Sequence, residues 1–167
     1  MKKFERVKAV VSLDAIAHNF AEMKKNIAKG TKIVAVIKAD GYGHGAEAIA
    51  RLIEDYDYIW GFAVATPEEA LQLRTFGVKK PILILGIVFE EYFTQMIAKE
   101  IRLTVCTYEM AQKLSEEAQR QGGDVLAGIA QHDNVFAGVG STLVLIFDAL
   151  VVHGIGELSG GSIGRTS

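Results

Sequence analysis

Cysteine is almost absent from this sequence, since Cys106 is the only one among 167 residues. A lone cysteine excludes an internal disulfide. The first ten residues, MKKFERVKAV, also lack the order of charged, apolar and small residues that marks a secretory signal. Both absences favour a reducing, cytoplasmic setting over secretion.

An excess of charge of either sign is also missing. The net charge is -2, from 18 basic and 20 acidic residues, and the isoelectric point is about 6.1. Without a broad basic field, nucleic acid and anionic lipid are poor partners, and a small molecule is the expected ligand. Half of the residues are apolar and 23% are charged, a balance typical of one soluble globular domain.

Apolar runs and amphipathic stretches alternate along the first 123 residues. The apolar runs favour strands, and the stretches between them begin at capping residues and end near glycines, which favours helices. Asp14 is expected to cap the first helix, while Thr66, Pro67 and Glu69 together make the signature of a capping box. The expected strands are 7–13, 32–38, 58–64, 81–86 and 101–105, and the expected helices are 14–28, 45–56, 66–77, 89–99 and 107–123.

The expected strands are almost continuously apolar, as in a parallel sheet that is buried on both faces. Strands and helices that alternate in this way predict an α/β fold of consecutive parallel β/α units. An open doubly wound sheet and a closed (β/α)8 barrel both accept the pattern, but a barrel needs about 250 residues. We therefore expect a partial (β/α)8 TIM-type barrel, whose open edges favour a homo-oligomer.

The composition changes near residue 123, so we predict a boundary between a barrel-like part at 1–123 and a different segment at 124–167. Residues 135–152 are long enough to be tested as a membrane span, but Asp148 and polar neighbours favour two strands instead. These strands are expected at 143–147 and 149–153. The Gly- and Ser-rich end is expected to fray.

The stretch AVIKADGYGHG, residues 35–45, carries the most chemistry. Lys38 follows an apolar strand, and parallel β/α folds bind ligands at the C-terminal ends of their strands. A partly desolvated amine there would have a lowered pKa and act as a nucleophile. The glycines allow sharp turns, Tyr42 adds a phenolic donor, and the next helix would offer N–H groups to an anion. These features suit pyridoxal phosphate, which carries both an aldehyde and a phosphate.

Other interpretations fit the same residues. Lys38 could be a solvated charge and the glycines a flexible turn. Gly41, Gly43 and Ala46 also satisfy the G-x-G-x-x-A dinucleotide fingerprint, but no acidic residue follows at the required spacing. His44 suits a structural hydrogen bond better than acid/base work.

The same eleven residues resemble the pyridoxal-phosphate lysine motif of alanine racemases. The similarity runs from VSLDAIAHNF through GFAVATPEEALQLRTFGVKKPILILG, and covers about residues 7–121. In that family the N-terminal domain is a (β/α)8 barrel, a β-rich domain follows it, and two subunits share each active site.

The resemblance implies a pyridoxal-phosphate-dependent racemase that interconverts L- and D-alanine and supplies D-alanine for peptidoglycan. Lys38 would bind the cofactor covalently and serve as one of two acid/base groups. Tyr42 would donate a hydrogen bond to the cofactor phosphate, and Leu85 would line the cofactor pocket. The second base would be a tyrosine from the partner subunit.

The family pattern is not recognised after Gln121. A K-I-D-T-G-M type of strand, an arginine facing the pyridine nitrogen and further phosphate ligands are not found in this sequence. We therefore expect the 167-residue chain to be weakly active or inactive as a racemase by itself. The alternative is a non-catalytic β/α scaffold or a phosphate-binding module in which Lys38 holds an anion without chemistry.

Overall fold

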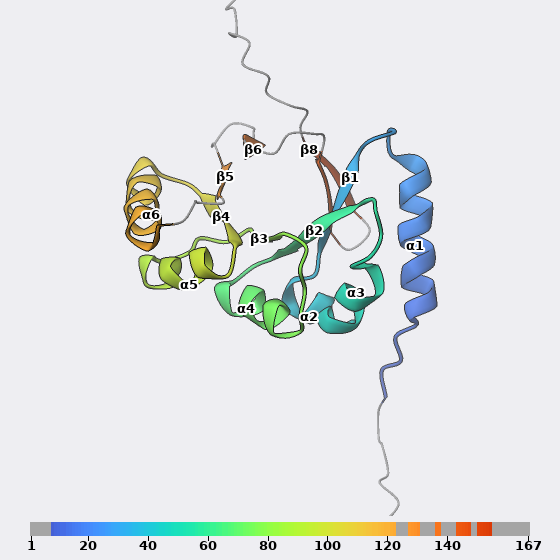
Figure 1. Ribbon diagram of the computed structural model, residues 1–167. Helices are drawn as coiled ribbons and strands as arrows, with labels where there is room; N and C mark the ends of the chain where they lie inside the picture. Colours follow the sequence, from blue (N-terminus) through green and yellow to red (C-terminus); the bar gives the residue numbers. More distant parts are fainter. Residues whose placement is uncertain (1–7, 123–126, 131–135, 138–142, 148–149, 155–167) are drawn as a thin grey trace, which may run out of the picture.

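The computed structural model describes residues 8–122 and four further strands at 127–130, 136–137, 143–147 and 150–154. These residues form an α/β structure with one sheet of eight strands (Figure 1). The elements, in chain order, are α1 (Leu13–Asn26), β1 (Lys32–Val36), α2 (Lys38–Tyr42), α3 (Ala46–Ile53), β2 (Ile59–Val64), α4 (Pro67–Thr75), β3 (Ile82–Ile84), the 3-10 helix η1 (Glu90–Tyr92), α5 (Phe93–Ala98), β4 (Ile101–Val105), α6 (Tyr108–Gln121), β5 (Ala127–Ala130), β6 (Phe136–Ala137), β7 (Leu143–Phe147) and β8 (Leu150–Gly154).

The sheet is built on five parallel strands, β1 to β5, which lie side by side in sequence order. β7 pairs in parallel with the other edge of β1, while β6 and β8 add antiparallel partners to β5 and β7. Among the strands described, β6 and β8 are therefore the two ends of an open sheet. Figure 1 shows the strands in an open arc with the helices along its outer side. The predicted partial barrel is confirmed.

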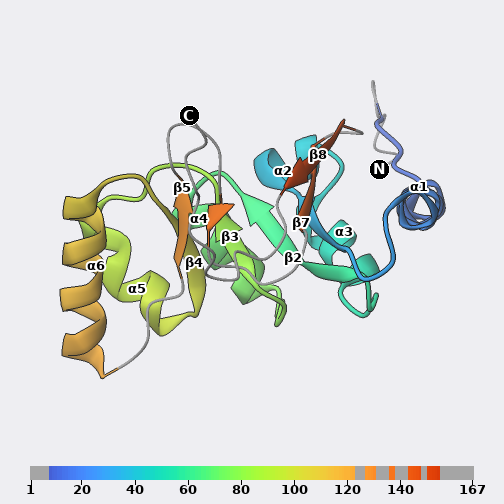
Figure 2. The ribbon, with the colours of Figure 1, turned by 90° about the horizontal axis from the view of Figure 1, so that it is seen from above.

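Capping residues fix where the helices begin. The Thr66 hydroxyl accepts a hydrogen bond from Glu69 N at 3.3 Å, and the Glu69 carboxylate accepts one from Thr66 N, so the predicted capping box of α4 is present. Thr107 caps α6 in the same way through Met110 N at 3.1 Å. α6 and α1 lie at opposite ends of the arc (Figure 2).

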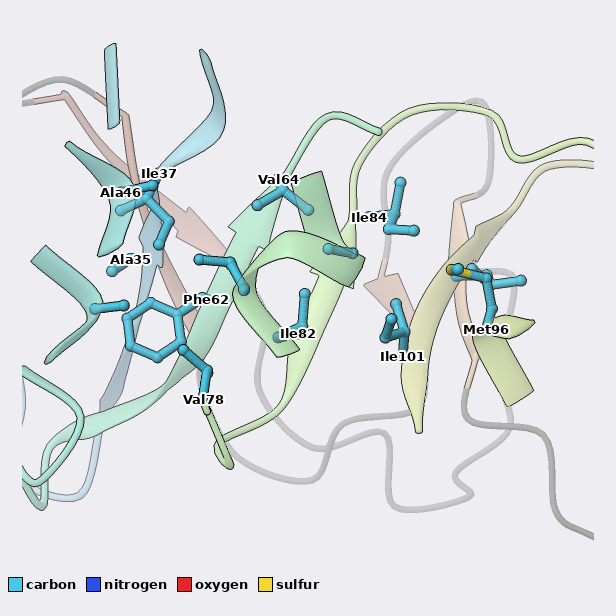
Figure 3. Close-up of a cluster of buried hydrophobic side chains, with 14 of the residues drawn as sticks. Ala35, Ile37, Ala46, Phe62, Val64, Val78, Ile82, Ile84, Met96 and Ile101 are labelled. Atoms are coloured by element: carbon cyan, nitrogen blue, oxygen red, sulfur yellow. The ribbon is translucent and has the colours of Figure 1, made fainter. Parts of the chain in front are cut away.

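The main hydrophobic core lies between the sheet and the helices (Figure 3). Phe62, Ile82 and Ile84 are fully buried there, at 0% exposure. Each apolar side chain of this size stabilises the fold by about 1.5–3 kcal/mol when it is buried. The core therefore holds β2 and β3 rigidly beneath the loops that follow them.

A second, smaller cluster covers the opposite face of the sheet, which we call the inner face. Its buried members are Val34, Val36, Ala63 and Leu83, and the partly buried side chains of Tyr42, Trp60 and Leu85 pack against them. Side chains of one strand alternate between the two faces of a sheet, so these residues interleave with those of the main core. The strands are thus buried on both faces, as their continuous apolar runs predicted.

The strand expected at 7–13 is wrong for the residues described. Residues 8–12 form neither strand nor helix, and Val10 is 80% exposed. A β-branched run becomes a strand only where a neighbour completes its hydrogen bonds, and no described strand pairs with this run. α1 follows directly, and its cap is Ser12, which accepts from Ala15 N at 3.2 Å, rather than Asp14.

Other boundaries also differ from the prediction, among them the ends of the strand expected at 81–86 and of the helix expected at 45–56. The strand expected at 32–38 ends at Val36, because Ile37 leaves the extended region with φ -126° and ψ 30°. The helix expected at 89–99 is divided into η1 and α5.

The strands expected in the last segment are found as β7 and β8, whereas the expected fraying end lies outside the described residues. No helix in the described part of the chain is long and apolar enough to cross a membrane.

Candidate functional site

Lys38 lies just beyond the C-terminal end of β1. It is the first residue of α2, two residues after Val36, and its side chain is half-buried. Its Nζ atom lies 5.8 Å from the centroid of the Tyr42 ring. The lysine therefore occupies the end of the parallel strands where β/α folds bind their ligands, as predicted.

A left-handed turn follows Lys38. Five consecutive residues have positive φ, namely Ala39 (50°), Asp40 (52°), Gly41 (62°), Tyr42 (54°) and Gly43 (82°). A left-handed conformation costs roughly 1–2 kcal/mol for each non-glycine residue, so the surrounding structure must offset several kcal/mol. A Cβ atom at Gly41 would lie 2.8 Å from Ile49 Cδ1, so a larger residue there would make the end of this buried side chain shift.

Hydrogen bonds within the turn use most of its backbone donors. The N–H groups of Gly41, Gly43 and Gly45 donate to carbonyl oxygens of the same loop at 2.8–3.2 Å. Asp40 Oδ1 accepts from Ala46 N, the first N–H group of α3, at 2.8 Å. The sequence led us to expect that the helix after the turn offers its N–H groups to an anion. This expectation is wrong for the Ala46 N–H group, which already donates to Asp40. The dinucleotide interpretation also loses the donors that would hold a pyrophosphate.

His44 stabilises the same turn. Its Nδ1 atom lies 3.0 Å from Gly41 O, which is the structural hydrogen bond that the sequence favoured. The described residues contain no group of three or more His, Cys, Asp or Glu side chains that could hold a metal ion.

Glu69 connects the turn after β1 to the loop after β2. Its Oε1 atom accepts from Ala39 N at 2.7 Å, and its Oε2 atom accepts from Ala65 N at 2.7 Å and from Thr66 N at 3.3 Å. The capping-box pattern predicted only the bond to Thr66. The bond to Ala39, thirty positions earlier, had no signal in the sequence.

Tyr42 and Leu85 both pack against the inner-face cluster, and Leu85 N donates to Val64 O at 2.8 Å directly after β3. The structure thus brings Lys38 and Tyr42 together and places Leu85 on the same face of the sheet. The roles of these three residues toward a cofactor stay predictions.

Arg102 and Trp60 form a pair on the sheet that sequence reasoning missed. The Arg102 guanidinium lies over the Trp60 ring, 5.0 Å from its centroid. Its Nε atom is buried, and no hydrogen-bond partner for it exists among the described residues. Loss of contact with water lowers the pKa of Arg102.

Residues 11–130 match the family described as alanine racemase, N-terminal domain. Alanine racemase 1 of Caldanaerobacter subterraneus subsp. tengcongensis is 44% identical over 124 residues, which are 71% of this chain and 31% of that protein. The chain thus spans about three tenths of the length of this curated relative.

Solved structures give the same result. The alanine racemase of Clostridium difficile 630 superposes with a TM-score of 0.68 at 37% identity, covering 71% of this chain and 31% of that one. The histidine racemase of Leuconostoc mesenteroides subsp. sake superposes with a TM-score of 0.62 at 30% identity, covering 69% and 30%. The family match, which extends over most of the chain and includes the lysine motif, confirms the resemblance seen in the sequence. The chain belongs to the alanine racemase N-terminal domain family.

Proposed function

We propose that this chain is the N-terminal part of a pyridoxal-phosphate-dependent racemase that interconverts L- and D-alanine. The observation that carries the proposal is the position of Lys38, which places a half-buried primary amine just beyond β1, beside a phenol and above an apolar sheet face. A primary amine is the group that binds an aldehyde covalently.

The residues present fit this cofactor. Lys38 supplies the amine, Tyr42 supplies a hydroxyl that would donate to the phosphate, and Leu85 supplies an apolar wall for the ring. The Asp40 carboxylate already caps α3, so the phosphate would be held by Tyr42 and by groups outside this loop. When bound, the cofactor supplies an electron-withdrawing ring that makes the α-hydrogen of an amino acid removable.

Lys38 would then move a proton. Its Nζ atom would take the α-hydrogen from one face of the substrate carbon and return it in the reverse direction. A second acid/base group must serve the opposite face, and by family resemblance it is a tyrosine of the partner subunit. The left-handed turn matters here because it sets the position from which Nζ reaches the substrate.

Alanine is the proposed substrate because the curated relative named above is an alanine racemase. The matched region does not by itself select alanine, since a histidine racemase shares its fold. A cytoplasmic location and a role in supplying D-alanine for peptidoglycan are part of the same proposal.

Self-association is also part of the proposal. β6 and β8 are open ends of the sheet in the described part of the chain, and Ile87, Phe89 and Tyr108 are exposed beyond β3 and β4. Unpaired strand edges and exposed apolar side chains favour contact with a second copy.

We also propose the boundary between a barrel-like part at 1–123 and a different segment at 124–167. The family match continues to residue 130, a few residues past this boundary.

The alternative, a non-catalytic phosphate-binding scaffold, is less well supported. It needs donors for an anion in the loop after β1, and the described N–H groups of Gly41, Gly43, Gly45 and Ala46 already have acceptors. An amine that serves only as a charge would also need no left-handed turn to aim it.

A covalent trapping experiment tests the proposal. The protein is mixed with pyridoxal phosphate, its visible absorbance is recorded, and borohydride reduction is followed by peptide mass spectrometry. We expect visible absorbance and a reduced adduct on Lys38. Lys38→Ala should lose both, and Lys38→Arg should also lose them because a guanidinium stays protonated and is a poor nucleophile.

The exposed Lys99 is a matched control, and Lys99→Ala should keep the Lys38 adduct. An adduct that is spread over surface lysines, or one that survives in Lys38→Ala, would contradict the proposal.

A further inference from the structure

We propose that Glu69 is a positioning residue for Lys38. In this view its carboxylate fixes the peptide group that follows Lys38 and thereby sets the direction in which Nζ points. This inference rests on the proposed function, in which Lys38 is the reactive amine. Glu69 itself does not contact the reacting atoms.

The geometry shows a carboxylate that serves two loops at once. Oε1 accepts from Ala39 N at 2.7 Å, and Oε2 accepts from Ala65 N at 2.7 Å. Ala39 directly follows Lys38, and Ala65 directly follows β2. β1 and β2 are neighbouring parallel strands, so one side chain ties together the C-terminal ends of both.

The distances indicate that this role goes beyond capping α4. The bond that belongs to the capping box, from Thr66 N, is the longest of the three at 3.3 Å. The two shorter bonds go to N–H groups that precede the helix. Hydrogen bonds to an ionised acceptor are shorter and stronger than neutral ones, so the carboxylate is bound most strongly at Ala39 and Ala65.

The left-handed turn explains why such a tie is needed. Ala39 is its first residue and has φ 50°, a conformation that non-glycine residues avoid. Lys38 lies between the strand and this turn. If Ala39 N were released, the turn would relax toward right-handed conformations, and the Lys38 side chain would move with it.

The test compares Glu69→Gln with Thr66→Ala. Glutamine still satisfies a capping box, but it has one acceptor oxygen and cannot accept at both Ala39 N and Ala65 N. Thr66→Ala removes the hydroxyl that caps α4 and leaves both of these bonds in place. The pair therefore separates the positioning role from the stability of α4.

Two measurements follow Lys38 in each variant. The first is the rate at which pyridoxal phosphate and borohydride label Lys38, read by peptide mass spectrometry. The second does not need the cofactor: lysines are reductively methylated with ¹³C-formaldehyde, and the chemical shift of the Lys38 methyl groups is recorded. The Tyr42 ring at 5.8 Å makes this shift sensitive to where Nζ lies.

We expect Glu69→Gln to slow Lys38 labelling by about tenfold or more, as misplacing a reacting group does, and to move the Lys38 methyl signal. Thr66→Ala should change neither. Adding Ala39→Gly to Glu69→Gln should restore part of the labelling rate, since glycine adopts positive φ without the cost of a Cβ atom.

The inference is overturned if Glu69→Gln labels Lys38 as fast as the unaltered protein does and leaves the methyl signal unchanged. It is also overturned if Thr66→Ala changes the labelling rate and the methyl signal as much as Glu69→Gln does. If the unaltered protein forms no Lys38 adduct at all, the proposed function fails. The methyl signal then still decides whether Glu69 positions the lysine.

Discussion

Arg74 offers a direct test of how the loops beneath the site are held together. Its guanidinium donates to four carbonyl oxygens at 2.8–3.0 Å. These oxygens belong to Val78, Lys80, Lys99 and Glu100. Arg74 thus connects α4 to the segment before β3 and to the turn before β4, where Glu100 has φ 52°. Burial lowers the pKa of Arg74, although the nearby carboxylates of Glu100 and Glu54 oppose this shift.

The change Arg74→Met keeps an unbranched side chain as far as the position of Nε and removes all four bonds. Each hydrogen bond from a charged donor contributes about 1.5–3 kcal/mol. The guanidinium is partly exposed, however, and water would satisfy some of the released carbonyls. We therefore expect a loss of about 3 kcal/mol in the free energy of unfolding, or about 6–12 °C in Tm for a chain of this size.

Urea titration followed by circular dichroism measures this loss, with Arg51→Met as the matched control. Arg51 is exposed, and among the described residues it pairs along its own helix with Glu47, at 2.8 Å, so its removal should cost no more than about 0.5 kcal/mol. If the two variants unfold at the same urea concentration with the same slope, Arg74 does not hold these loops together and the reasoning is refuted.

Two further predictions concern the site, and a third concerns α6. Tyr42→Phe should weaken cofactor affinity by about 1.5–3 kcal/mol, the range for a hydrogen bond to a charged acceptor, while the Lys38 adduct still forms. Titration of the adduct absorbance measures the affinity. Equal affinity in the variant and the unaltered chain would exclude Tyr42 from phosphate binding. The 167-residue chain assayed alone should racemise alanine about 10² to 10⁴ times more slowly than a complete enzyme, because Lys38 serves one face of the substrate carbon. Exchange of the α-hydrogen in deuterated water for one enantiomer only would support this prediction, and full racemisation would contradict it. Hydrogen bonds, chiefly from Arg120 and Thr94, lower the pKa of Glu117 to about 2. Its carboxylate therefore stabilises the fold at a pH above its usual pKa near 4.5, and this contribution is lost as the pH falls through 2. The stability of Glu117→Gln should accordingly differ from that of the unaltered chain at about pH 5, and the two should converge near pH 2 in an acid-unfolding titration.

Much of the fold could be predicted because its signals are local. Thr66 and Thr107 begin helices where their hydroxyls cap N–H groups three residues on, and the apolar runs between helices became buried parallel strands. The run at 7–13 is also apolar and β-branched, but its described residues do not form a strand. A strand needs a second strand beside it, and a short stretch of sequence does not show whether one is there. The lysine motif identified the family correctly for the same local reason.

The parts of the site that could not be predicted depend on contacts between distant residues. The glycines of the motif indicated a turn, but Ala39 and Tyr42 also take positive φ, which composition alone argues against. The bond from Ala39 N to Glu69 joins two loops that only the pairing of β1 with β2 brings together. Arg102 over Trp60 likewise depends on strand register, which a single sequence does not reveal.

The position of β1 in the sheet has a consequence for how the protein is made. One edge of β1 pairs with β2, which follows it closely, but the other pairs with β7, and Lys32 and Leu143 are partners across about 110 residues of sequence. Ribosomes add roughly 5–20 residues per second, so this edge waits on the order of ten seconds for its partner during synthesis. During that interval the strand that leads to Lys38 presents open hydrogen-bonding groups on one side. Chaperones that shield strand edges should therefore raise the soluble yield of this chain, and should do so most while residues 37–143 are being translated.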